Sequence, residues 1–338
     1  MTFMRKFETI LIKSSNNICK ISSENGIALD IYDKNFNLLS HKKLIKGFFS
    51  FLDYWFNIDK KDGLYGLIND KGGSLLYFYI TDRYIVKKKI YSYNPDSTFI
   101  KFVYINSRSE YTNIFYYILN TNDPYNTQLI HHFKKNNKWY TATVDYLSYN
   151  VLTNFVVTYA SDNTPEIFYY KIIDGIEELF VSFFDIDSLT WKTPVQVTHS
   201  KKSKIYLSVI KDSSNCYHIL FSENNLSRYH CTYIKGCVDN NNFNIKNSTI
   251  ISNTVACTFP NIVKYDSKLY AHWIEYHNLY VCRSDNYGFS WNEVFIHEPS
   301  SNCPFNCCNY HDNMIQNQVF NYFTLFMKEN SYEILGIN

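Results

Sequence analysis

The sequence is poor in arginine, glycine and proline, and its charges are few and evenly spread. Its 338 residues include 5 Arg, 10 Gly and 7 Pro, charged residues make up 19%, and the formal net charge is +2. A nucleic-acid-binding protein usually carries a basic patch or stripe, and none is present, so we expect no nucleic-acid partner. With 46% hydrophobic residues and no long run of one charge, the composition also excludes a disordered chain.

Long hydrophobic runs are missing as well. No stretch approaches the roughly 18 apolar residues that a membrane-spanning helix needs. Residues 1–13 contain no apolar run of the kind found in signal peptides. We therefore expect a soluble protein without a cleaved signal peptide, located in the cytoplasm or in a spore or cell-surface layer.

Cysteine is scarce in the first half of the chain, where Cys19 stands alone. The other eight follow residue 200: Cys216, Cys231, Cys237, Cys257, Cys282, Cys303, Cys307 and Cys308. Because the total of nine is odd, the sequence does not predict a complete disulfide framework.

Aromatic residues are the abundant class. Phe, Trp and Tyr make up 18% of the chain, including 31 Tyr and 26 Phe, and these residues favour β-strands. Helical periodicity is almost absent, whereas short alternating runs such as 75–81 and 166–172 recur between polar turns. The sequence therefore predicts an all-β protein with a sizeable core.

A pattern of four short strands repeats along the chain. In each repeat an aromatic residue closes a polar turn before the fourth strand, and successive turn aromatics are 48 to 55 residues apart: Phe36, Tyr84, Trp139, Trp191, Phe243 and Trp291. The hairpin at 8–25 is also similar to that at 206–224, and 179–191 parallels 279–291. Four-stranded repeats of roughly 40 to 50 residues are typical of β-propeller blades.

This repeat predicts one β-propeller domain over residues 1–338, with six or seven four-stranded antiparallel blades. The expected blades are approximately 1–46, 47–95, 96–150, 151–200, 201–254 and 255–298. The tail 299–338 contains another hairpin-like stretch, Asn321 to Ile337. It either starts a seventh blade or closes the ring against the N-terminal region, and the sequence leaves both alternatives open.

One turn carries a family motif. Ser284-Asp285-Asn286-Tyr287-Gly288-Phe289-Ser290-Trp291 resembles the Asp-box of sialidase-like BNR-repeat propellers, with Asn286 where the motif has Asp. The resemblance covers this blade alone, with a degenerate echo at 185–191. In that family the box is a turn on the side away from the active site. The resemblance therefore implies a structural role for these residues: Ser284, Asn286, Gly288, Ser290 and Trp291.

The resemblance also raises sialidase activity, which in that family needs three arginines to hold a substrate carboxylate, a Tyr nucleophile with a Glu partner, and an Asp acid/base. Lysine replaces a bidentate guanidinium poorly. None of the arginines is expected to open an innermost strand: Arg5, Arg83, Arg108, Arg228 and Arg283. No Phe/Tyr-Arg-Ile-Pro motif is present either. The sequence therefore argues against sialidase activity.

Candidate ligand-binding residues are those expected between the second and third strands or at the start of an innermost strand, where propellers usually form their ligand face. Paired carboxylates there would suit a glycosidase, and exposed aromatic rings would stack on sugars. The candidates are Asp53, Tyr54, Trp55, Asp123, Tyr125, Glu177 and Glu275. Solvated loop carboxylates and packed aromatic rings are the simpler interpretation of each.

The densest group of cysteines lies at 303–311. Cys303, Cys307, Cys308 and His311 offer four soft ligands, but their spacing matches no paired Cys-x2-Cys zinc pattern. Structural or cross-linking thiols are favoured, and adjacent cysteines on a loop would permit thiol-mediated self-association. We therefore predict no metal site. No glycine-rich phosphate loop or common hydrolase motif is present, so we predict no cofactor.

Together these features favour a non-catalytic β-propeller that binds a carbohydrate or a protein partner on its loop face, because the sialidase catalytic set is missing. A structural or assembly protein of a surface or spore layer is the first alternative, and it would use tyrosines and the tail cysteines for contacts. A glycoside hydrolase of sialidase-like fold, with an unrecognised carboxylate pair, is the second.

Overall fold

The structure, a computed structural model, describes residues 4–108, 111–136, 138–253, 256–313, 320–321, 324–329, 331 and 333–337. Within these segments nearly all regular structure is β-strand, and the single helix is the short α1 (Glu298–Asn302). No helix in the described segments has the length and apolar character needed to cross a membrane. The prediction of an all-β protein is confirmed.

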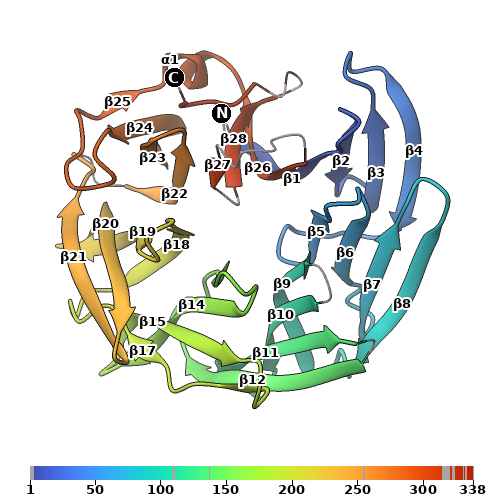
Figure 1. The fold of residues 1–338 in the computed structure, drawn as a ribbon, viewed down its shortest axis with the longest axis horizontal. Coiled ribbons are helices and arrows are strands. Elements are labelled where there is room, and N and C mark those ends of the chain that lie inside the picture. Colours follow the sequence, from blue (N-terminus) through green and yellow to red (C-terminus); the bar gives the residue numbers. More distant parts are fainter. Residues whose placement is uncertain are drawn as a thin grey trace. The chain divides into compact units, whose positions relative to one another are not determined.

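The chain forms two compact units. Unit 1 consists of Met1–Lys6, Tyr149–Cys308 and Asn317–Asn338, and unit 2 of Phe7–Ser148 and Asn309–Gln316. In each unit, antiparallel strands follow one another across a blade in chain order, as the blue-to-green and green-to-red ribbons show (Figure 1).

Unit 2 contains the first three blades. The first is built from β1 (Met4–Ile12), β2 (Ile18–Ser22), β3 (Ile27–Tyr32) and β4 (Leu38–Ile45). The second is built from β5 (Tyr54–Ile58), β6 (Leu64–Asn69), β7 (Ser74–Ile80) and β8 (Ile85–Ser92). The third is built from β9 (Thr98–Arg108), β10 (Tyr111–Asn120), β11 (Asp123–Lys135) and β12 (Lys138–Ser148).

Unit 1 contains the other three blades. The fourth has β13 (Val156–Tyr159), β14 (Pro165–Ile173) and β15 (Ile176–Asp185), and its outer strand is split into β16 (Thr190–Trp191) and β17 (Val195–Gln196). The fifth has β18 (Lys204–Lys211), β19 (Tyr217–Asn225), β20 (Arg228–Asp239) and β21 (Asn242–Ile250). The sixth has β22 (Thr258–Tyr265), β23 (Lys268–Glu275), β24 (Asn278–Ser284) and β25 (Phe295–Ile296).

The tail extends existing sheets instead of starting a seventh blade. β26 (Phe305–Asp312) and β28 (Thr324–Lys328) continue the first sheet in the order β28-β26-β1-β2-β3-β4, and β27 (Phe320–Asn321) pairs with β22. Within the predicted hairpin 321–337, residues 322–323, 330 and 332 lie outside the described residues. The described segments thus form six blades of the β-propeller type, which confirms the fold class and decides the blade number.

The turn aromatics occupy the predicted place in the blades. Each lies in the turn before the fourth strand or on the first residues of that strand: Phe36, Tyr84, Trp139, Trp191, Phe243 and Trp291. The interpretation of this period as one four-stranded unit per repeat is confirmed.

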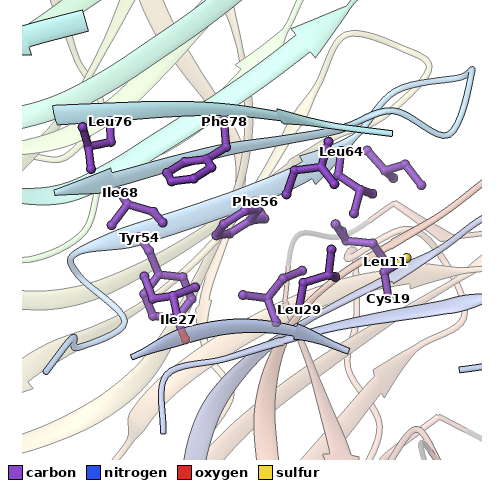
Figure 2. Packing of buried hydrophobic residues seen from close by; sticks show 13 residues of the cluster. Leu11, Cys19, Ile27, Leu29, Tyr54, Phe56, Leu64, Ile68, Leu76 and Phe78 are labelled. Carbon is purple, nitrogen blue, oxygen red and sulfur yellow. The ribbon is translucent and has the colours of Figure 1, made fainter. Parts of the chain in front are cut away.

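The cores lie between the sheets of successive blades. In unit 2 the inward side chains of the first two blades form one buried cluster, which includes Leu11, Cys19, Ile27, Leu29, Tyr54, Phe56, Leu64, Ile68, Leu76 and Phe78 (Figure 2). Fully burying a side chain of this size contributes about 1.5–3 kcal/mol. Burial in this apolar cluster also raises the pKa of the Cys19 thiol to about 11.

The turn 284–291 between β24 and β25 is held by its own side chains. Ser284 Oγ accepts a hydrogen bond from the Gly288 amide at 2.8 Å, and Asn286 Oδ1 accepts one from the Ser290 amide at 2.8 Å. Asn286 Nδ2 also donates to Ser290 Oγ at 2.8 Å. Asn286 thus organises the turn through its side-chain oxygen, as an Asp would.

The same turn is anchored on the fifth blade. Gly288 has a φ of +83°, and a Cβ at this position would lie 1.8 Å from Tyr233 Oη. Trp291 packs edge-on against the Tyr233 ring, with the ring centroids 4.9 Å apart. Asn247 Nδ2 donates to the Gly288 carbonyl at 2.6 Å. Both the conformation and the contact therefore require glycine at this position.

Candidate functional site

At one end of the sheets in unit 1 lie the connections between second and third strands and the starts of the first strands, where a ligand site was predicted. Neighbouring strands are antiparallel, so the first strands begin where the turns between the second and third strands lie. We call this the 2–3 end of the unit. Glu177, near the start of β15, and Glu275, at the end of β23, both lie there and are buried. The simpler interpretation of these two as solvated loop carboxylates is therefore wrong.

Two first strands carry a β-bulge close to this end. The pairing register shifts at 205–207 of β18 and at 258–261 of β22. An aromatic residue with left-handed backbone lies at each shift: φ is +54° at Tyr206 and +49° at Phe259. Such a conformation at a bulky residue costs on the order of 1–3 kcal/mol and persists only where surrounding contacts enforce it.

Hydrogen bonds from neighbouring elements enforce the first bulge. Tyr170 Oη, on β14, donates to the carbonyl of Tyr206 at 2.8 Å. Asn154 Nδ2, just before β13, donates to the carbonyl of Leu207 at 2.8 Å. Both bonds come from the fourth blade and hold two successive carbonyls of the fifth, so the bulge is fixed by packing between blades.

The two bulges bring their aromatic rings together. The rings of Tyr206 and Phe259 are half-buried and lie 4.8 Å apart between centroids, with an interplanar angle of 42°. The strands that carry them are joined by the Ile262 amide, which donates to Ser208 Oγ at 3.1 Å. β-Bulges often redirect side chains next to binding sites. Here they set two aromatic rings side by side.

A buried ion cluster lies beside the first bulge. Lys204 opens β18 and is fully buried; its Nζ lies 2.9 Å from Glu178 Oε2 and 3.7 Å from Glu223 Oε1. It also donates to the carbonyls of Glu177 at 3.1 Å and Lys202 at 2.6 Å. Two carboxylates thus surround one ammonium group. Removal of Lys204 would leave both carboxylates buried without a counter-ion, and removal of both glutamates would leave the ammonium group buried without one.

Glu178 is the best-satisfied member of this cluster. Besides Lys204, it accepts hydrogen bonds from Thr198 Oγ1 at 2.5 Å and from the Lys201 amide at 2.7 Å. Burial raises the pKa of Glu178, but the hydrogen bonds from Thr198, Lys204 and Lys201 and the charge of Lys204 outweigh it. The net result is a pKa below the usual value of a glutamate.

Glu177 differs from its neighbour. Its side chain is buried, with 3% of the residue exposed, and Oε2 has no hydrogen-bond partner among the described residues. A buried polar atom without a partner is rare and calls for an explanation.

The turns at the 2–3 end present side chains on strained backbone. Each is a two-residue hairpin in which both central residues have positive φ: Asp174-Gly175, Leu226-Ser227 and Tyr276-His277. Turns of this kind favour Asn-Gly or Asp-Gly, as the first has. In the other two, the bulky leading residue is 90% exposed at Leu226 and 70% exposed at Tyr276.

Asp53, a predicted candidate in unit 2, is also buried. It lies 2.8 Å from Lys71 Nζ and 3.8 Å from Lys101 Nζ, and it accepts hydrogen bonds from the amide and hydroxyl of Ser50 at 2.8 and 2.7 Å. These contacts tie the start of β5 to the turn after β6 and to β9. Asp53 is therefore an anchor between the second and third blades and not a solvated carboxylate.

The remaining candidates of unit 2 lie in different surroundings. Tyr54 is buried in the core cluster (Figure 2), so its ring is not available to stack on a sugar, contrary to the prediction. Trp55 is half-buried against Tyr104, with ring centroids 5.0 Å apart. Asp123 and Tyr125 are exposed at the start of β11, and Asp123 accepts a hydrogen bond from Asn126 at 2.8 Å.

Most of the residues that build the site in unit 1 are not among those predicted from the sequence. These are Lys204, Glu178, Glu223, Tyr206 and Phe259. A weak signal was available for the aromatic pair, because an aromatic residue recurs in the first strand of a third blade as Phe102; the bulge and the φ of +54° at Phe102 are seen only in the structure. No comparable signal marks Lys204, since its partners come from other strands.

The two described arginines of unit 1 do not form a pair that could hold one carboxylate. Arg83 precedes β8 in unit 2 and is exposed. In unit 1, Arg228 is exposed at the start of β20, whereas Arg283, at the opposite end of β24, pairs with Asp285 at 3.1 Å. The side chains of Arg5 and Arg108 lie outside the described part of the structure.

Two of the tail cysteines do not lie on a loop as expected, whereas Cys303 lies in the connection between α1 and β26 and is half-buried. Cys307 and Cys308 are adjacent residues of β26 and both are buried, which gives no support to cross-linking between molecules. Adjacent strand residues also point to opposite faces of a sheet. Among the described residues no group of three or more His, Cys, Asp or Glu side chains is placed to hold a metal ion.

Comparison with known proteins shows similarity in fold alone. No protein-family model matches the sequence, and no curated protein matches it. Two structures of a PL25 polysaccharide lyase, an ulvan lyase, one of them bound to -[GlcA(1-4)Rha3S]-, match with a TM-score of 0.62 and 9% identity. The match covers 99% of this chain and 95% of theirs.

Two further solved structures are similar. A prolyl endopeptidase matches with a TM-score of 0.55 and 10% identity over 88% of this chain and 43% of its own. The WD40 domain of SCAP from fission yeast matches with a TM-score of 0.50 and 10% identity over 95% of this chain and 72% of its own. WD40 repeats form β-propellers, so these likenesses agree with the blade architecture. Identities this low carry no assignment of activity.

Proposed function

We propose that this protein is a non-catalytic β-propeller that binds a carbohydrate at the 2–3 end of unit 1. The observation that carries the proposal is the pair of bulged first strands, which holds the Tyr206 and Phe259 rings 4.8 Å apart on strained backbone. Strain maintained by packing between blades is often found at ligand-binding sites. Half-buried aromatic rings offer the flat apolar face on which a sugar ring stacks.

The polar groups near the rings fit the same ligand class. The single positive charge of Lys204 cannot neutralise both of the carboxylates that face it, those of Glu178 and Glu223. Glu177 adds a further buried oxygen that lacks a donor. An uncharged ligand rich in hydroxyl groups is compatible with this surplus of carboxyl groups, whereas an anionic ligand would meet like charge.

The turn 284–291 supports a relationship to BNR propellers, which we include in the proposal. Its hydrogen bonds run from side chains to the turn backbone, and Gly288 supplies the positive φ. One neighbour in the fold comparison, the ulvan lyase, is bound to -[GlcA(1-4)Rha3S]-. The likeness supports the fold, and the carbohydrate proposal rests on the site of this chain.

The test is a glycan-array screen of the purified protein, followed by affinity measurement on any glycan retained. We expect competable binding to at least one glycan and a loss of about tenfold in affinity for Tyr206→Ala, the cost of one stacking ring. Phe102→Ala is the matched control, since it removes an aromatic from an equivalent bulge in unit 2 and should leave binding unchanged. Thermal unfolding of each variant confirms that it is folded.

Three results would overturn the proposal. A blank array with folded protein would reject a carbohydrate ligand and leave a protein partner for the loop face. Undiminished binding by Tyr206→Ala would place the ligand elsewhere. Hydrolysis of a retained glycoside, abolished by Glu177→Gln, Glu275→Gln or Asp53→Asn, would replace a binding protein with a glycosidase.

A further inference from the structure

The fifth blade carries a pair of cysteines that the candidate site does not use. Cys216 precedes β19 and is buried, and Cys237 lies on β20 and is half-buried. The β19–β20 ladder pairs Tyr217 with Gly236, so the next pair along the same antiparallel register is Cys216 and Cys237. The two side chains therefore share one face of the sheet on adjacent strands.

The backbone hydrogen bonds of Cys216 show whether Cys216 and Cys237 form a hydrogen-bonded or a non-hydrogen-bonded pair of the antiparallel ladder. Its amide donates to Asp212 Oδ1 at 2.9 Å, and its carbonyl accepts from the Asp212 amide at 2.8 Å. Both groups thus point toward the β18–β19 turn and away from Cys237, which makes the cysteines a non-hydrogen-bonded pair. In such pairs the Cα atoms are about 4.5 Å apart, within the roughly 4.4–6.8 Å that a disulfide spans.

Lys246 completes the cluster from the third strand of this group. The β20–β21 register shifts at Gly236, which leaves Lys246 as the extra residue of a bulge. Its Nζ donates to Cys216 Sγ at 3.3 Å. Burial raises the pKa of the Cys216 thiol, and the hydrogen bond and charge of Lys246 oppose that rise. Contact with Cys216 and Cys237 in turn raises the pKa of the exposed Lys246 ammonium.

We propose that Cys216 and Cys237 form a redox-active dithiol that closes to a disulfide by exchange with small-molecule disulfides, with Lys246 positioning and stabilising the Cys216 thiolate. The proposal is independent of the carbohydrate site. It differs from cross-linking between molecules, because both cysteines belong to one sheet.

The reaction proceeds in two exchange steps. The more accessible Cys237 thiolate attacks one sulfur of the external disulfide, forms a mixed disulfide and releases one thiolate. The Cys216 thiolate then attacks the Cys237 sulfur, forms the intramolecular bond and releases the second thiolate. The two protons lost by the protein thiols pass through solvent to the released thiolates. Two protein thiols are oxidised, and one external disulfide is reduced to two thiols.

The experiment exposes the full-length protein to oxidised glutathione, blocks remaining thiols by alkylation and analyses intact mass and non-reduced peptides. We expect a linked peptide pair that contains Cys216 and Cys237, an intact mass lower by two hydrogens in a sample taken before alkylation, and no retained glutathione on this pair. A stable glutathione adduct on Cys237, or full alkylation of both cysteines after exposure, would overturn the proposal.

Variants separate the two roles. Cys216→Ser should stop at the glutathione adduct of Cys237, while Cys303→Ser, which removes a half-buried cysteine outside the pair, should close as the parent does. Lys246→Met should slow closure roughly three- to tenfold, because less Cys216 thiolate is present. Lys246→Arg should restore most of the rate. Closure of Lys246→Met at the parent rate would reject the role of Lys246, and Lys246 is exposed, so folding is not at risk.

Discussion

At the residue scale, several bulky side chains hold backbone conformations that usually belong to glycine or asparagine. Leu226 is the clearest case, because it has φ +53° and is 90% exposed, so little packing compensates the strain. Tyr206 and Phe259 have similar φ values but are half-buried, and their rings pack against each other. The strain at Leu226 is therefore a cost to stability, whereas the strain at the bulges also builds the aromatic pair.

We predict that Leu226→Asn stabilises the protein by about 1 kcal/mol, because asparagine adopts the left-handed conformation more readily and the leucine makes few contacts. The free energy of unfolding from urea denaturation measures the effect. Ile85→Asn is the matched control: Ile85 is 41% exposed on β8, where it pairs in regular register with Ile80 and asparagine is disfavoured, so this change should be neutral or mildly destabilising. Equal effects of the two substitutions would show that backbone strain at Leu226 is not the cause.

Residues of this kind limited what the sequence could predict about the site. Any aromatic in an alternating run is expected to be a core residue, and Tyr54 is one. Tyr206 also lies in an alternating run of the sequence, yet the register shift on β18 places its ring against Phe259 instead of in the core. Lys204 looks like a surface lysine, but Glu178 and Glu223 approach it from two other strands. These placements depend on contacts with other strands of the same and of the neighbouring blade, which local patterns do not encode.

At the element scale, the turn before the fourth strand is the best-predicted feature. Its signals are local: a polar turn, then an aromatic, repeated from Phe36 to Trp291, and in one blade the full Ser284 to Trp291 motif. Local hydrogen bonds, such as Asn286 to Ser290, explain why so short a segment determines its own shape. The outer strand that follows is less regular, since it is split into β16 and β17 in the fourth blade.

We predict that Gly288→Ala destabilises the protein by at least about 3 kcal/mol, because a Cβ would overlap Tyr233 Oη and φ is +83°. Gly175→Ala is the matched control. Gly175 has nearly the same φ, +82°, but no atom lies within 4 Å of the Cβ position, so only the conformational cost of about 1 kcal/mol remains. Chemical denaturation of both variants measures the difference, and equal losses would contradict the contact with Tyr233.

At the scale of the whole chain, six blades of one design need not share one set of buried polar groups. Unit 2 buries Asp53 against two lysines at the start of β5, whereas unit 1 buries Lys204 against two glutamates at the start of β18. The repeat in the sequence predicted the common scaffold because the scaffold depends on turn and strand signals. It could not predict these clusters, in which equivalent positions carry opposite charge.

Buried histidines in both units predict how stability depends on pH. Burial lowers the pKa of His132 and of His272 from 6.5 to about 4. The unfolded chain therefore binds protons more readily below pH 6.5, so this contribution to stability is present above pH 6.5 and is lost as the pH falls toward 4. At pH 5 the expected loss is about 2 kcal/mol per histidine relative to pH 7.5.

Urea denaturation at pH 7.5, 6 and 5 tests this prediction. Asp212 does not interfere in that range: burial raises its pKa, but hydrogen bonds from His218 and the Cys216 amide outweigh it and lower the value to about 2, so its contribution is lost only below about pH 4. His132→Gln should make the dependence shallower by the contribution of one histidine, because glutamine can still bond Tyr116 and Thr141 but does not titrate in this range, while His272 still does. A free energy of unfolding that stays constant from pH 7.5 to 5 would mean that these imidazoles already bind protons in the folded protein.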